Sequence, residues 1–184
     1  MTSAPSCVPG ATVWFTGLPS AGKTTIAAAV ADRLHLRGRP VEVLDGDAVR
    51  PVLSTELGYS RADRDANVAR IGWVATRLAR HGVLVLAAVV SPFARARDQV
   101  RAAHQDAGLR FLEIHVATPV QVCAERDVKG LYARQRGGRL QNLTGIDGEY
   151  EPPVSPAARL DTRDRSVDDV VDELITLLEK ENLL

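Results

Sequence analysis

The sequence has 184 residues and carries 23 basic and 23 acidic side chains, so its formal net charge is zero. A chain of this length predicts one domain, residues 1–184. Its composition, 45% hydrophobic and 25% charged, excludes a disordered protein. The balanced charge gives no support to a general nucleic-acid binder.

Neither a membrane span nor a secretory leader is predicted. The most apolar run, residues 82–94, is shorter than the roughly 20 residues that a spanning helix needs. The stretch before Lys23 lacks the basic start and apolar middle of a signal peptide. Cys7 and Cys123 offer at most one disulfide and no metal-ligand spacing. We therefore expect a cytoplasmic protein with reduced thiols, no membrane contact and a flexible N-terminus over residues 1–10.

Short apolar segments alternate with helical patterns along the chain, which predicts an α/β fold with a parallel sheet and right-handed crossovers. One segment, residues 83–90, is apolar throughout, as in a strand that helices cover on both faces. Two helices are expected to begin with capping boxes, at Ser60 and at Ser166. The predicted strands are residues 11–16, 40–44, 83–90 and 109–116, and the predicted helices include residues 26–34, 61–81 and 167–181.

Both capped helices have an apolar stripe at helical spacing, which predicts the face that each one buries. The first stripe comprises Val68, Ile71, Val74, Ala75 and Leu78, and the second comprises Val167, Val170, Val171, Leu174, Leu177 and Leu178.

Residues 128–156 are rich in glycine and proline and have little periodicity, which is typical of a lid or binding loop. Four cations and no acid occur between residues 128 and 146: Lys129, Arg134, Arg136 and Arg139. A mobile cationic cover suits phosphoryl transfer, because negative charge builds up on the transferring oxygens. The alternative is a solvated basic loop that contacts no ligand.

Residues 17–24 read Gly-Leu-Pro-Ser-Ala-Gly-Lys-Thr and fit the phosphate-binding pattern G-x-x-x-x-G-K-[ST] without a mismatch. A predicted strand precedes this phosphate loop and a predicted helix follows it, as the pattern requires. Glycines let backbone N–H groups converge on phosphate oxygens at the positive end of the helix dipole. Lys23 is expected to hold the β- and γ-phosphates, and the Thr24 hydroxyl is expected to join the shell of Mg²⁺.

The loop predicts that the protein binds a nucleoside triphosphate, but it does not show which reaction the nucleotide undergoes. The Asn-Lys-x-Asp motif of GTPase switches does not occur. The second predicted strand instead ends in Asp45-Gly46-Asp47, beside the phosphate loop. Two carboxylates there suit Mg²⁺–water binding and activation of an acceptor hydroxyl, with Asp47 reaching the metal through a water. The alternative is a turn at Asp45 and a helix cap at Asp47.

Further motifs occur in order along the chain: Asp45-Gly-Asp-x-x-Arg50, Leu57-Gly-Tyr59-Ser60, Asp63-Arg64-x-x-Asn67, Ser91-Pro-Phe93, Arg126-Asp-x-Lys-Gly-Leu-Tyr132 and Thr144-Gly-Ile-Asp147. With the phosphate loop, they resemble the adenylylsulfate kinase (APS kinase) family over about residues 12–182. The resemblance implies a P-loop kinase with a five-stranded parallel sheet, helices on both faces and a basic lid. The implied reaction moves the γ-phosphoryl of MgATP to the 3′-hydroxyl of adenylyl sulfate, a step of sulfate assimilation.

The resemblance also implies a homodimer, a sulfate adenylyltransferase partner, and roles for individual residues. Asp47 would face the acceptor hydroxyl, and Tyr59 stands where the family commonly has a phenylalanine that stacks on the substrate adenine. The implied ATP ligands are Gly17, Leu18, Pro19, Ser20, Ala21, Gly22, Lys23, Thr24, Thr25 and Arg126. The implied acceptor ligands are Asp45, Asp47, Arg50, Tyr59, Arg64, Asn67, Val90, Ser91, Lys129, Gly130 and Leu131.

Ser91 matches a serine that serves as a phosphoenzyme residue in some members. Direct in-line transfer needs only positioning and charge stabilisation, which favours a Ser91 that hydrogen-bonds substrate. Two other functions stay open. One is a P-loop kinase for another small hydroxyl acceptor, such as a nucleoside, a sugar acid or an antibiotic. The other is a nucleotide-binding regulator without turnover.

Overall fold

The fold is that of a computed structural model, which describes residues 10–184. Cys7 and residues 1–9 of the predicted flexible N-terminus lie outside the described residues. Gly10, the first described residue, is buried against Ala79, whose carbonyl oxygen would lie 1.9 Å from an added Cβ. Within residues 10–184, no helix combines the length and apolarity that crossing a bilayer requires.

A five-stranded parallel sheet forms the centre of the molecule, in the order β2-β3-β1-β4-β5. The strands are β1 (Ala11–Thr16), β2 (Val41–Asp45), β3 (Leu84–Ala88), β4 (Arg110–Val116) and β5 (Ala158–Leu160). The parallel α/β sheet predicted from the sequence is therefore confirmed. No segment was predicted for β5, because three residues are too few to show a strand pattern.

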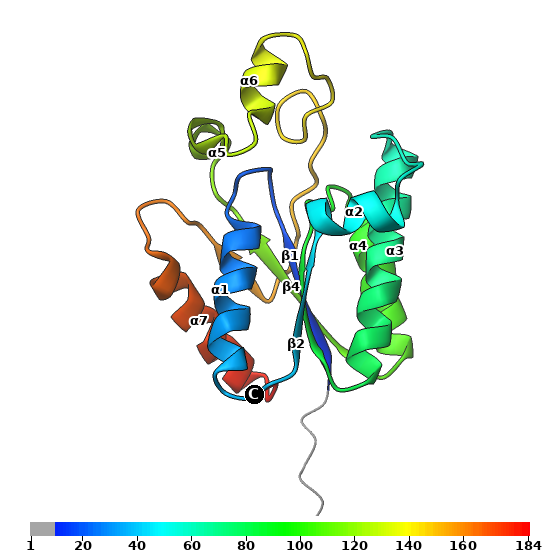
Figure 1. The fold of residues 1–184 in the computed structure, drawn as a ribbon, viewed down its shortest axis with the longest axis vertical. Helices are drawn as coiled ribbons and strands as arrows, with labels where there is room; N and C mark the ends of the chain where they lie inside the picture. Colours follow the sequence, from blue (N-terminus) through cyan, green and yellow to red (C-terminus); the bar gives the residue numbers. More distant parts are fainter. Residues whose placement is uncertain (1–9) are drawn as a thin grey trace, which may run out of the picture.

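Helices cover both faces of this sheet, and the two layers are visible in Figure 1. Side chains of β1 alternate between them: Val13 and Phe15 join the cluster of α1 and α7, and Trp14 joins that of α3 and α4. The helices are α1 (Lys23–His35), α2 (Gly46–Leu53), α3 (Arg61–Arg80), α4 (Ala94–Asp106), α5 (Val120–Arg126), α6 (Leu131–Arg136) and α7 (Val167–Lys180).

Both predicted capping boxes are confirmed, at Ser60 for α3 and at Ser166 for α7. The stripe predicted for α3 faces the sheet, with Val68, Ile71 and Ala75 buried and Val74 and Leu78 packed beside them. The stripe predicted for α7 is wrong at its start. Val167 is 42% exposed, because the first turn of α7 reaches past the core to the edge of a cleft, and Ile175 is buried instead.

The loops that follow β1, β2 and β3 meet at one edge of the sheet, because parallel strands all end there. The segment 128–156 lies above this edge (Figure 1). It is not without structure, since it contains α6 and a β-bridge between Thr144 and Gly148. A helix of six residues is too short to produce a periodic pattern, so the sequence did not reveal it.

The contact between α3 and α4 depends on Gly72. A Cβ on this residue would lie 2.5 Å from Val100 Cγ2 and 2.8 Å from Val100 Cγ1. We predict that Gly72→Ala lowers the free energy of unfolding by about 1–3 kcal/mol, because the helices must separate, although alanine is the better helix former. Urea unfolding measures the loss, and adding Val100→Ala should return part of it. If Gly72→Ala unfolded with the same urea midpoint as the wild-type protein, the close contact would not limit the packing of the two helices.

Candidate active site

A cleft of about 860 Å³ opens at the edge where the strands end. Residues from the phosphate loop, the ends of β2 and β3, α3 and the segment 126–144 line it. Most residues that the sequence analysis selected therefore come together here. Among the implied ligands, four do not line the cleft: Gly17, Leu18, Ala21 and Gly130. Of the four cations predicted to cover the site, Lys129 and Arg134 line it, and Arg136 and Arg139 do not.

The phosphate loop requires glycine where its backbone turns most sharply. Gly17 has φ 152°, and a Cβ there would lie 2.4 Å from the carbonyl oxygen of Val116. Gly22 has φ 105° and is the N-cap of α1. Neither position tolerates a side chain without strain. The loop therefore presents backbone N–H groups and the start of a 13-residue helix to the cleft.

Lys23 lies inside this loop and bonds to its backbone. Its Nζ donates to the carbonyl oxygens of Gly17, at 2.9 Å, and Leu18, at 2.8 Å. Burial lowers the pKa of Lys23 to about 8, from an ordinary value of 10.5. The ammonium group is thus held where phosphate oxygens would meet it, at a cost in solvation that an anion would offset.

Asp45 and Asp47 have different roles at the start of α2. Asp45 is the N-cap, and its Oδ1 accepts the backbone N–H groups of Asp47 (2.9 Å) and Ala48 (3.2 Å). The predicted alternative that Asp47 caps this helix is therefore wrong. The carboxylate of Asp47 lies in the cleft and forms an ion pair with Lys129. It has no capping bond to break when it contacts a ligand.

Two oxygen-bearing side chains could hold Mg²⁺. Thr24 Oγ1 donates to Asp45 Oδ2 at 2.5 Å, and both residues line the cleft. Among residues 10–184, no group of three or more His, Cys, Asp or Glu side chains could hold a metal by itself. Mg²⁺ commonly takes one or two protein oxygens and completes its shell with phosphates and waters. Thr24 and Asp45 fit that pattern.

Four side chains, Arg50, Tyr59, Arg64 and Asn67, form a wall of the cleft that we call the acceptor wall. The guanidinium of Arg50 lies over the Tyr59 ring, 4.4 Å from its centroid. Arg64 donates to Tyr59 O at 2.9 Å, Thr144 Oγ1 at 2.8 Å and Asn142 O at 2.8 Å. Burial and the nearby Arg50 lower the pKa of Arg64, and the guanidinium stays charged.

Asn67 lines the cleft and holds an unsatisfied, enclosed acceptor atom. Its side chain is buried, at 7% exposure, and its Oδ1 has no hydrogen-bond partner among the described residues. A buried acceptor without a donor costs about 1–3 kcal/mol, so such atoms are rare in folded proteins. The oxygen itself is not open to the cleft, although the residue lines it.

Ser91 follows β3 in a left-handed backbone conformation, with φ 39°. Its hydroxyl accepts from Trp14 Nε1 at 3.0 Å and donates to Val89 O at 3.3 Å, and the residue is 1% exposed. The buried Arg97 donates to the Ser91 carbonyl at 2.7 Å and pairs with Glu113. The hydroxyl is thus occupied by the core. The neighbouring Val90 lines the cleft, and its carbonyl accepts from Thr16.

The segment 126–132 contributes several residues to the lining of the cleft. Arg126 donates to the side chain of Thr162 at 2.8 Å and to its carbonyl at 3.0 Å, beside the phosphate loop. Lys129 forms an ion pair with Asp47, and Leu131 also lines the cleft. The predicted lid therefore contacts the acid that the sequence analysis placed at the acceptor.

Comparison with known proteins decides the family. A family model described as adenylylsulphate kinase matches residues 9–161. The chain belongs to the adenylylsulfate kinase family. The adenylyl-sulfate kinase of Synechococcus sp. strain JA-3-3Ab is 50% identical over 175 residues, covering 95% of this chain and 97% of that protein. The one from Chloroflexus aurantiacus is 48% identical over 180 residues, covering 98% and 95%.

A solved structure of this family has the same fold. The APS kinase CysC of Mycobacterium tuberculosis, in complex with AMPPNP and APS, superposes with a TM-score of 0.90. It is 47% identical, and the match covers 93% of this chain and 98% of that one. The P-loop kinase fold implied by the resemblance is therefore confirmed.

The site of this adenylylsulfate kinase also contains residues that the sequence analysis did not select. Thr118 and Thr162 both donate to Ala21 O, at 2.9 and 3.3 Å, and so hold the phosphate loop from below. No motif marked these threonines, because a single polar residue after a strand has no pattern. Asp147 and Tyr132 did lie in quoted motifs, but only the structure shows what they contact.

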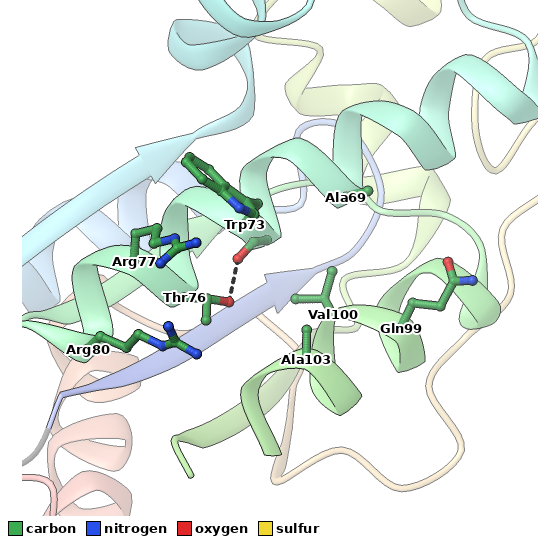
Figure 2. A pocket seen from close by; sticks show the side chains of 9 residues that line it. Ala69, Trp73, Thr76, Arg77, Arg80, Gln99, Val100 and Ala103 are labelled. Atoms are coloured by element: carbon green, nitrogen blue, oxygen red, sulfur yellow. Dashed lines mark hydrogen bonds between the residues drawn. The ribbon is translucent and has the colours of Figure 1, made fainter. Parts of the chain in front are cut away.

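A second, smaller cavity of about 330 Å³ lies on the outside of the α3/α4 layer (Figure 2). Trp73, 62% exposed, and Arg77 lie along its edge on α3, and Gln99 and Ala103 come from α4. None of the side chains that Figure 2 draws belongs to the phosphate loop or the acceptor wall. This cavity is separate from the catalytic cleft.

The lowered pKa of Lys23 predicts proton uptake when the kinase binds ADP. At pH 8 about half of this lysine is uncharged in the free protein, and phosphate oxygens favour the charged form. We expect uptake near pH 8 that shrinks toward pH 6.5, where the free lysine is already charged. Calorimetry in buffers of different ionisation enthalpy measures it.

The control is Lys23→Arg, because a guanidinium stays charged throughout this range. This variant should bind ADP without the uptake seen near pH 8, whatever its affinity. Equal uptake by both proteins at that pH would show that another group titrates.

Proposed function

We propose that this kinase transfers the γ-phosphoryl of MgATP to the 3′-hydroxyl of adenylyl sulfate, giving 3′-phosphoadenylyl sulfate and ADP. The observation that carries the proposal is the layout of one cleft. The phosphate loop, the acceptor wall and the Asp47 carboxylate all line the same cleft. The related kinase CysC was solved with an ATP analogue and APS together, which supports two nucleotides in such a cleft.

At the nucleotide end, the phosphate loop from Gly17 to Thr25 binds the phosphates of ATP. Lys23 exchanges the carbonyls of Gly17 and Leu18 for phosphate oxygens, which restores the solvation that burial removed. Arg126 is held beside the loop by Thr162 and contacts the nucleotide from the α5 side. Ser20 and Pro19 complete the rim of the loop.

Thr24 and Asp45 are the residues that would hold the Mg²⁺ that accompanies ATP, and Asp47 would reach it through a water. When bound, the ion would supply positive charge for the phosphate oxygens. The short contact between Thr24 and Asp45 keeps both oxygens on the same side of the cleft.

At the acceptor end, each member of the wall meets one part of adenylyl sulfate. Arg50 and Arg64 offer planar guanidinium groups to the phosphosulfate. The exposed Tyr59 ring stacks on the adenine, and the side-chain amide of Asn67, which lines the cleft, bonds to a ribose hydroxyl. Val90, Ser91 and Leu131 shape the pocket.

Asp47 acts on the 3′-hydroxyl. Its carboxylate accepts the hydroxyl proton as the ribose oxygen forms a bond to the γ-phosphorus, while the bond from that phosphorus to the β–γ bridging oxygen breaks. Lys129 pairs with Asp47 in the free protein, so its charge is already beside the reacting atoms. There it can stabilise the transferring phosphoryl group while the turn at Gly130 carries the lid over the substrate.

The two alternatives explain less of the cleft. A kinase for another hydroxyl acceptor has no need of the Lys129-Gly-Leu-Tyr132 segment or of the Arg64 and Asn67 pair. A regulator without turnover has no need of a carboxylate at Asp47 that lies in the cleft and makes no helix-capping bond. We also propose a cytoplasmic homodimer that uses no nucleic acid and receives its substrate from a sulfate adenylyltransferase partner.

Coupled release of ADP tests the reaction. With MgATP present, ADP should form only when adenylyl sulfate is added, and mass spectrometry should find one added phosphate on that acceptor. A nucleoside, gluconate and an aminoglycoside serve as other acceptors. Equal release with these, or with no acceptor, would contradict the proposal.

The same assay tests Asp47. We expect Asp47→Asn to lower kcat by more than about a hundredfold, because the variant loses the proton acceptor, while the affinity for ATP stays near the wild-type value. Asp106→Asn at the end of α4 is the matched control and should leave kcat unchanged. A kcat near wild type for the Asp47 variant would remove this residue from the chemistry.

Ser91→Ala tests the phosphoserine alternative. Because the Ser91 hydroxyl is hydrogen-bonded to Trp14 and Val89 in the core, we expect the variant to keep most of its kcat and to unfold at a lower temperature. Rapid-quench analysis with γ-labelled ATP should find no labelled protein. Complete loss of turnover by a folded Ser91→Ala protein would instead support a covalent step.

A further inference from the structure

Tyr132 makes a contact that the proposed reaction does not use. Its hydroxyl donates to the carbonyl oxygen of Pro19, in the phosphate loop, at 3.0 Å. The residue is almost completely buried, at 1% exposure, although it lies in the first turn of α6, a short helix of the lid. Burial raises the pKa of Tyr132, so the hydroxyl keeps its proton and remains a donor.

The backbone at Tyr132 is also held by hydrogen bonds. Asp127 accepts the N–H of Tyr132 at 3.0 Å with one carboxylate oxygen and the N–H of Ala133 at 2.9 Å with the other. This cap closes the turn that contains Lys129. A buried ring therefore joins Pro19 to the turn that places Lys129 against Asp47.

A second part of the lid packs on Leu18, the neighbour of Pro19 in the phosphate loop. Gly145, with φ 88°, packs so closely on Leu18 that a Cβ would lie 2.4 Å from its Cδ2. The neighbouring Thr144 accepts from Arg64 of the acceptor wall. Two parts of the lid, at Tyr132 and at Gly145, thus contact Leu18–Pro19, and each continues to a side chain of the acceptor site.

From this arrangement we propose that the Tyr132–Pro19 hydrogen bond couples the two substrates: nucleotide in the phosphate loop positions the lid through Tyr132 and so tightens the binding of adenylyl sulfate. Tyr132 is a positioning residue in this account, because it acts through Lys129. The inference rests on the proposed function. Coupling of this kind is reciprocal, so adenylyl sulfate also tightens the binding of nucleotide by the same factor.

Calorimetry measures the coupling as the ratio of the adenylyl sulfate Kd without ADP to that with saturating ADP. We expect Tyr132→Phe to lower this ratio by about threefold to tenfold, the range that one hydrogen bond supports. The affinity for ADP alone should stay within about twofold of wild type, because the variant keeps the ring and the loop. A merely structural role would not change the ratio.

Tyr150→Phe is the matched control. Tyr150 also has a hydroxyl held inside the protein, but it bonds to Thr16 Oγ1, at 3.2 Å, and not to the phosphate loop. This variant should keep the wild-type ratio.

Three outcomes would overturn the inference. A wild-type ratio in Tyr132→Phe, or an equal fall in both tyrosine variants, removes Tyr132 as the link and leaves the proposed reaction intact. Failure of the wild-type protein to bind adenylyl sulfate with ADP present contradicts the proposed function itself, and the coupling with it.

Discussion

The phosphate loop depends on a backbone path that only glycine allows. Gly17 passes so close to the carbonyl of Val116 that a single added carbon would collide with it. This close approach brings the loop from β1 onto the end of β4 and leaves Lys23 enclosed by its own loop carbonyls. Thr118 and Thr162, which follow β4 and β5, then hold the loop through the carbonyl of Ala21. Helix α1 begins in this loop, and the lid contacts it through Tyr132 and Gly145.

The cations of the cleft have partners inside the protein before any substrate binds. Lys23 bonds to loop carbonyls, Lys129 pairs with Asp47, and Arg64 bonds to the backbone and a side chain of the lid. Each contact replaces part of the hydration that the charge loses in the cleft. Anionic substrates can exchange these partners for phosphate and sulfate oxygens. The arrangement keeps like charges close together without leaving any of these three groups unpaired.

A buried ion pair lies in the core next to Ser91. Arg97 and Glu113 pair in the core, and Arg97 also holds the carbonyl of Ser91 in its left-handed turn. A buried pair of this kind contributes more to a fixed geometry than to stability, and removing one partner would leave an uncompensated charge. The strained turn at Ser91 places Val90 at the cleft and turns the serine hydroxyl toward Trp14.

Local patterns were enough to predict the parallel sheet, both capping boxes, the phosphate loop and the carboxylates after β2, since each depends on spacing along a short segment. They could not separate Asp45 from Asp47, because either can cap a helix at that spacing and only the folded turn shows which one does. They also missed β5, Thr162 and the contact from Tyr132 to Pro19. That contact joins residues 113 positions apart, and such a distance is closed only when the whole sheet brings the ends of its strands together.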